Sequence, residues 1–268
     1  MMKIMRYLTI EKFGWLLSDN GIFLGSAGAQ SDLNEGVYDP TYIRRLVEAH
    51  PEKYVPAQLL HENIDKDDLD KFSADMMQIS RERQYLCSWF AGDSESAEMW
   101  RNYAPDGVAI ISEDMLIDLN MPQPVRLATH MLTVTYNSKK KQTEIHNPLA
   151  VKDDKYSYEN EFRIIFNPQI FSIYTGFNVE KFGECFIGGK RTFEHEEITQ
   201  AVNMEQIDDA LNFVREKGDG YLFLYPLNKI ITEIRISPYC TAEQEQEIKA
   251  IMNDSGLKVP LGKSSISE

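Results

Sequence analysis

The residues with the clearest chemical potential lie in YSYENEFRII, residues 156–165, where Glu159, Glu161 and Arg163 are spaced two apart. Successive side chains of a strand point to opposite faces, so this spacing predicts two carboxylates and a guanidinium on one face and Tyr158 on the other. Such carboxylates can stabilise a developing positive charge, accept a proton or bind Mg²⁺. Two interpretations stay open: a solvated row of ion pairs, or the edge of a polar pocket.

A second group of polar and aromatic residues precedes this segment, in CSWF and EMWRNYA. Trp100 and Tyr103 are three apart and share a helical face, which is typical of core packing. Together with Ser88 and Trp89, they could equally line a pocket for a planar ring. Arg6 lies in the apolar opening stretch, where a charged residue usually marks a solvent-exposed edge.

Well-known catalytic motifs are missing from the chain. It has no GxxxxGK[ST] phosphate loop, no GxGxxG, no HExxH and no GxSxG. The five histidines do not show metal-ligand spacing. Cys87, Cys185 and Cys240 form no CxxC pair and lie among apolar residues, so we predict buried free thiols.

Composition narrows the class of protein. The chain has 268 residues, 43% of them hydrophobic, which is enough for a sizeable core. With 42 acidic and 28 basic residues its formal net charge is −14, which disfavours nucleic acid and anionic membranes as partners. No apolar run is long enough to span a bilayer and nothing resembles a signal peptide, so we expect a cytoplasmic protein.

The elements that must position these residues follow from the apolar periodicity. It predicts strands at 3–10, 21–25, 85–90, 108–112 and 125–136, and helices over 93–104, 204–218 and 241–256. Regular alternation of strands and helices is absent. We therefore predict one α+β domain over residues 1–268, with a mixed or mostly antiparallel sheet, flanking helices and a helical insertion at about 38–82.

The order of these segments resembles the bacterial Domain of Unknown Function 2971 family nearly end to end. The resemblance is carried by RYLTIEKFGWLLSDNGIFLGSA, YLCSWFAGDSESAEMWRNYAPDGVAI, KYSYENEFRIIF and ITEIRISPYCTAEQEQEIKAIM. Its most specific parts are W-x-x-Y followed shortly by a glycine, and Y-x-Y-E-x-E-x-R. One departure is SDLNEG, where the family usually has a turn similar to Asn-Asp-Pro.

The chain is also similar, more distantly, to ADP-ribosyltransferases of the arginine–serine–glutamate type. That resemblance implies that Arg6 holds the phosphates of NAD and that Ser88 helps fix the nicotinamide ribose. It implies that Glu161 stabilises the transition state as nicotinamide leaves, while Glu159 positions or deprotonates an acceptor. Trp89 or Tyr103 would stack on nicotinamide, and bacterial members often act as toxins or phage-defence effectors.

The hypotheses for function are therefore of different classes. One is an enzyme that uses NAD as substrate, an ADP-ribosyltransferase or NAD glycohydrolase, whose partners are a nucleotide-like small molecule or an acceptor protein. The second is a non-catalytic binding or sensor module of a defence or regulatory system. The third is phosphodiester chemistry with Glu159 and Glu161 as ligands to Mg²⁺. The NAD hypothesis requires Arg6, Ser88 and Glu161 to converge on one cleft.

Overall fold

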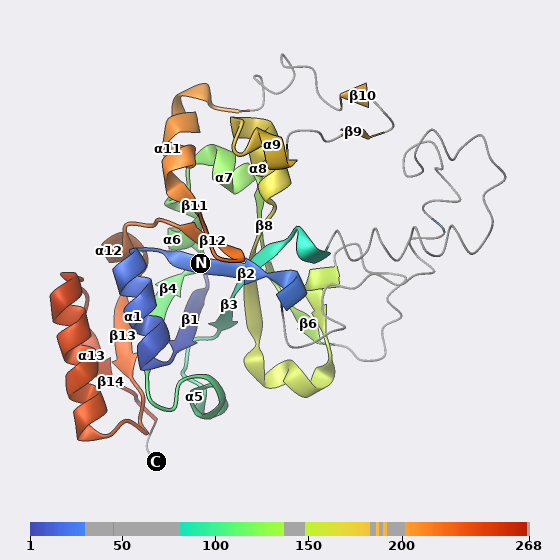
Figure 1. Ribbon diagram of the computed structural model, residues 1–268. Coiled ribbons are helices and arrows are strands. Elements are labelled where there is room, and N and C mark those ends of the chain that lie inside the picture. The colour runs from blue at the N-terminus through green and yellow to red at the C-terminus, as the bar shows by residue number, and fades with distance from the viewer. Residues whose placement is uncertain are drawn as a thin grey trace.

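The computed structural model describes residues 1–29, 45, 81–136, 148–182, 186–187, 190–191 and 202–266. Over these residues the chain is an α+β protein with a mixed, mostly antiparallel ten-stranded sheet flanked by helices (Figure 1), which confirms the predicted fold class. The helical insertion predicted at about 38–82 lies almost entirely outside the described residues and stays a prediction.

The large sheet follows the order β11-β12-β2-β3-β1-β4-β13-β14, with β8 paired to β3 and β5 paired to β8. Only β13 and β14 run parallel within it. Its strands are β1 (Lys3–Leu8), β2 (Ile22–Ser26), β3 (Tyr85–Ala91), β4 (Val108–Glu113), β5 (Thr129–Thr133), β8 (Glu161–Phe166), β11 (Val214–Lys217), β12 (Gly220–Phe223), β13 (Glu233–Ile236) and β14 (Leu261–Lys263). Two small sheets pair β6 (Thr135–Tyr136) with β7 (Val151–Lys152) and β9 (Phe186–Ile187) with β10 (Lys190–Arg191).

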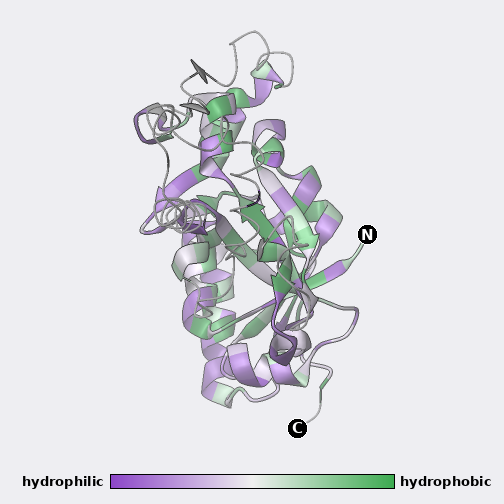
Figure 2. Cartoon of the chain, turned by 90° about the vertical axis from the view of Figure 1, so that its right-hand side faces the viewer, coloured by the Kyte–Doolittle hydropathy of each residue, from purple (hydrophilic) through white to green (hydrophobic). Residues whose placement is uncertain are grey.

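Apolar strands form the centre because both of their faces are covered. Every residue of β8 is buried, as are the first five of β4. Figure 2 shows these central strands in the hydrophobic colours, while the surrounding helices alternate between hydrophilic and hydrophobic residues. The chain passes so closely beside Gly107 that a Cβ there would lie 1.9 Å from the carbonyl oxygen of Leu8, so no other residue fits without a backbone shift.

Helices flank the sheet in groups (Figure 1). Among them α1 packs beside α13, while α7, α8, α9 and α11 gather at the opposite end of the molecule. Their bounds are α1 Ile10–Asp19, α5 Ala97–Tyr103, α6 Asp114–Leu119, α7 Gln123–Leu127, α8 Pro168–Thr175, α9 Val179–Phe182, α11 Ile207–Phe213, α12 Leu227–Ile230 and α13 Ala242–Ser255. A capping box of Thr241 and Gln244 starts α13 and left-handed Gly256 ends it, so this helix matches the one predicted over 241–256.

Two predicted elements are wrong in part. Residues 125–136 are not one strand, because α7 occupies the start: Pro124 suits a first helical turn, and Arg126 donates to the carbonyl of Asp118. Residues 204–218 are not one helix, because the chain leaves the helical conformation at Val214 and pairs along β12. In the first place a proline in the first turn favours the helix, and in the second, pairing with β12 outweighs the local apolar pattern.

The sheet forks at β3, and this fork creates the candidate site. On one edge β3 pairs with β8 over Tyr85–Phe90. On its other edge it pairs with β2 only at 85–86 and with β1 only at 90–91. Among the described residues, positions 87–89 therefore have no strand partner on that edge. Strands β1 and β2 diverge there, and α1 connects them.

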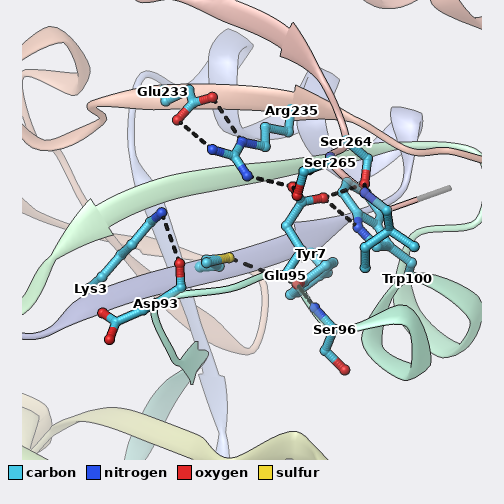
Figure 3. Close-up of polar contacts among 12 residues, drawn as sticks. Lys3, Tyr7, Asp93, Glu95, Ser96, Trp100, Glu233, Arg235, Ser264 and Ser265 are labelled. Atoms are coloured by element: carbon cyan, nitrogen blue, oxygen red, sulfur yellow. Dashed lines mark hydrogen bonds and ion pairs between the residues drawn. The ribbon is translucent and has the colours of Figure 1, made fainter.

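A buried carboxylate ties the C-terminal segment to the sheet (Figure 3). Glu95 accepts hydrogen bonds from the indole Nε1 of Trp100 (2.9 Å), from the backbone N of Ser265 (2.9 Å) and from the hydroxyl of Ser264. It also pairs with Arg235 of β13, and its side chain has no exposed surface. Burial raises the pKa of Glu95, but these donors outweigh burial and lower the pKa to about 2.

We expect this carboxylate to make stability depend on pH. Because the folded pKa lies below the ordinary value of 4.5, the stabilisation is complete above pH 4.5 and is lost as pH falls towards about 2. Glu95→Gln should lower the free energy of unfolding by about 2 kcal/mol near neutral pH. Urea unfolding of both proteins should show this difference shrinking below pH 4.5. A difference that stays constant down to pH 3 would contradict the role given to the carboxylate.

Candidate functional site

A cavity of about 820 Å³ lies in the fork between β1 and β2. Its walls include side chains of β1, α1, β2, β3 and α5, together with the segment leading into β8. Three residues singled out from sequence, Arg6, Ser88 and Glu161, all line this cavity, and Glu159 and Tyr103 line it as well. The convergence that the NAD hypothesis requires is therefore present.

Glu161 is the most heavily bonded carboxylate of the cavity. Arg163 donates through Nε to Oε1 at 2.9 Å and through Nη2 to Oε2 at 2.8 Å. The hydroxyl of Ser88 also donates to Oε1. Ser88 and Arg163 lie opposite each other in the β3–β8 ladder, which brings both donors to one carboxylate. Burial raises the pKa of Glu161, but Arg163, Lys152 and Ser88 outweigh burial, so the pKa lies below its ordinary value. Glu161 is therefore an anion near neutral pH.

Glu159 does not lie on the strand, so this part of the sequence prediction is wrong. A 3₁₀ helix covers Asp154–Glu159, and β8 begins only at Glu161. Asn160 separates them and adopts the left-handed conformation, with φ of 34°. Its carbonyl accepts a hydrogen bond from the backbone N of Ala91, and its side-chain amide donates to the carbonyl of Ala91. The turn nevertheless keeps both carboxylates together, because both approach one lysine.

Lys152 joins the two glutamates. Its Nζ lies 2.6 Å from Oε2 of Glu159 and 3.4 Å from Oε2 of Glu161. The same ammonium lies 4.7 Å from the ring centroid of Tyr156. Since a cation already lies between the carboxylates, the arrangement does not favour the Mg²⁺ hypothesis. No group of three potential ligands suited to a metal ion occurs among the described residues.

Exposure also decides between the two interpretations of the charged row. Arg163 is fully buried, and Glu159 and Glu161 are each 5% exposed, so a solvated surface row is wrong. The cluster has balanced charge, because it pairs the two glutamates, Glu159 and Glu161, with Lys152 and Arg163. Buried ions require such compensation.

Phenol groups surround the cluster and are held neutral. Tyr103 donates to Glu159, and burial together with that carboxylate raises the pKa of Tyr103. Tyr136 accepts from the backbone N of Glu161 at 2.8 Å, and burial raises its pKa to about 12. Both side chains can therefore donate or accept hydrogen bonds, but neither acts as a base near neutral pH.

The remaining predicted residues divide into those at the cavity and those behind it. Trp89 lines the cavity, but it is only 2% exposed and packs mainly in the core. Trp100 is fully buried and bonded to Glu95, so the core interpretation of this residue is the one that holds. Tyr158 packs against the same core cluster as Trp100. Tyr158, Trp100 and Arg163 are not among the lining residues, so we assign Arg163 the positioning of Glu161.

Sequence reasoning missed Lys152, and no pattern marks it: it lies in AVKDDKY, eleven residues after the lysine triplet at 139–141. It also missed Lys12 and Trp15 of α1 and Phe23 of β2, which line the cavity. Trp15 had a usable signal, because it lies off the apolar stripe of its helix, which Phe13, Leu16 and Leu17 form.

Comparison with known proteins gives no family or function for the chain. No protein-family model, curated protein or solved structure matches the chain. No helix in the described part of the chain is long and apolar enough to cross a membrane.

Proposed function

We propose that the protein consumes NAD, as an ADP-ribosyltransferase or NAD glycohydrolase, and that it is related to the Domain of Unknown Function 2971 family. The observation that carries the proposal is the convergence of Arg6, Ser88 and Glu161 on one cavity from three separate segments. These residue types fit the phosphates, the ribose and the departing nicotinamide of NAD. A cavity of about 820 Å³ is large enough for a ligand of this size.

The chemistry needs a negative charge beside the ribose. As the bond from C1′ to the nicotinamide nitrogen breaks, nicotinamide leaves with the bonding electrons and positive charge develops on the ribose. The Glu161 carboxylate, fixed by Arg163 and Ser88, stabilises that charge without having to reorganise. Water or an acceptor then attacks C1′, and Glu159 accepts its proton.

Release of nicotinamide tests this proposal. Incubation of the full chain with NAD should yield nicotinamide and either free ADP-ribose or a modified acceptor, separated by chromatography. Free ADP-ribose would identify a glycohydrolase, whereas transfer to protein would identify a transferase. If the wild-type protein neither consumes NAD nor binds it in calorimetry, the proposal is refuted.

One observation favours a second candidate, a non-catalytic sensor. Both carboxylates are already compensated, Glu159 by Lys152 and Glu161 by Arg163. A site that only binds a nucleotide needs no unpaired carboxylate to accept a proton. This candidate predicts nucleotide binding without turnover, together with a stable protein partner in pull-down experiments.

A further inference from the structure

One face of α1 has an unusual composition for a surface in contact with a cavity. Lys12, Trp15 and Asp19 are three and four residues apart, so they share a face, and all line the cavity. The apolar stripe of α1 packs into the core instead. Trp15 is left 52% exposed, although its large apolar surface would favour burial. An exposed indole in a cavity wall offers a flat surface to a ligand.

A second aromatic surface faces the cavity from β2. Phe23 is 36% exposed and lines the same cavity. Its ring lies against two glycines that pair across the β2–β12 ladder, Gly25 and Gly220. A Cβ on Gly220 would lie 2.4 Å from Cζ of Phe23, and a Cβ on Gly25 would lie 3.6 Å from its Cε1. Missing side chains at these positions therefore make room for the ring.

Basic residues outnumber acidic ones in this part of the cavity, where Arg6, Lys12 and Lys217 line the wall together with Asp19 and Asp219. The net charge is −14, yet Arg6 and Lys12 both line the cavity wall. Within the described ranges, no carboxylate lies at ion-pair distance from either residue. Lys217 differs, because it pairs with Asp19 at 2.5 Å. Unpaired cations beside exposed rings match an anion that carries a planar group.

We propose that this outer part of the cavity binds the purine base and phosphates of a nucleoside diphosphate, with the base stacked on Trp15 and Lys12 beside the phosphates. The site deepens the proposed function, on which it rests, because NAD contains an adenosine diphosphate group. The β1–β2 fork would then receive the nicotinamide ribose at Glu161 and the base at α1. Base stacking on an aromatic side chain tolerates different bases, so discrimination among purines is expected to be weak.

Tryptophan fluorescence gives a direct test with ADP as the probe. The chain has three tryptophans; Trp89 is 2% exposed and Trp100 is fully buried, so we expect Trp15 to give most of the response to ADP. Titration of ADP into the full chain should quench the emission, and Trp15→Leu should lose most of this quenching. Calorimetry should show that Trp15→Leu weakens ADP binding about tenfold, whereas Trp15→Phe retains most of the affinity.

A matched control is Leu119→Ala, on α6, which removes a 62%-exposed apolar side chain outside the cavity and should leave ADP binding unchanged. Failure of ADP to bind, or equal binding by Trp15→Leu and the wild type, would overturn the site. Nicotinamide release is measured separately on the same proteins. If ADP binds through Trp15 and no nicotinamide is released, the site stands and the proposed function fails. If nicotinamide is released with the same KM in Trp15→Leu, the function stands and the site fails.

Discussion

Glu161→Gln should lower the rate of nicotinamide release from NAD by about 100- to 1,000-fold. Glutamine keeps the size of the side chain but removes the charge that would stabilise the developing cation. The change should act mainly on kcat, because the interaction strengthens as the bond to nicotinamide breaks. Single-turnover measurements with saturating NAD would separate this effect from binding.

The same substitution also breaks a buried ion pair, so its structural cost needs its own control. The chain offers one with the same residue types and spacing in Glu233→Gln on β13, where the side chain of Glu233 is 32% exposed and that of Arg235 is 20% exposed. There Arg235 donates to Glu233 through Nε at 2.8 Å and Nη2 at 3.2 Å, across the same two-residue spacing, and this pair does not line the cavity. If Glu233→Gln lowers nicotinamide release as strongly as Glu161→Gln, the loss reflects folding, and Glu161 has no part in the chemistry. Urea unfolding of both variants should show how much each pair stabilises the fold.

Sequence periodicity was sufficient to predict the fold class because the central strands are short, apolar and buried. The segments at 85–90 and 108–112 match β3 and β4 closely. It failed where pairing with another strand determines conformation. Val214–Lys217 continues a helical pattern, yet it becomes a strand because it forms a hairpin with β12, which begins after two intervening residues. The fork depends on pairing between distant segments, since β1 and β2 pair with different ends of β3.

Of the site, sequence singled out several of the residues that line the cavity but not how they are arranged. A spacing of two placed Glu161 and Arg163 on one face, and the structure brings them together as a bidentate pair. The same spacing wrongly extended the strand to Glu159, because the chain turns through the left-handed conformation at Asn160, a residue type that adopts it more readily than most. Lys152 reaches both carboxylates from β7, a two-residue strand whose position depends on pairing with β6. Local patterns carry no information about such contacts.

Arg163→Met should lower the free energy of unfolding by about 3–5 kcal/mol near neutral pH. The guanidinium is fully buried, neutralises Glu161 and donates to the carbonyl of Leu149 at 2.6 Å. Methionine fills much of the volume but leaves a buried carboxylate with less compensation and a carbonyl without this donor. Urea unfolding followed by circular dichroism would measure the loss. An unchanged urea midpoint would show that the pair does not stabilise the fold.

The pH dependence of this loss separates charge from packing. In the wild type, Arg163 is the largest influence opposing burial on the pKa of Glu161. Without it, burial raises that pKa, so Glu161 takes up a proton at higher pH and the penalty for an unpaired charge fades. The difference in unfolding free energy between wild type and Arg163→Met should therefore shrink as pH falls through 4.5.

The double variant Arg163→Met with Glu161→Gln should be more stable than Arg163→Met alone, because no unpaired carboxylate remains. A double variant less stable than the single one would mean that lost packing, and not the unpaired charge, causes the effect.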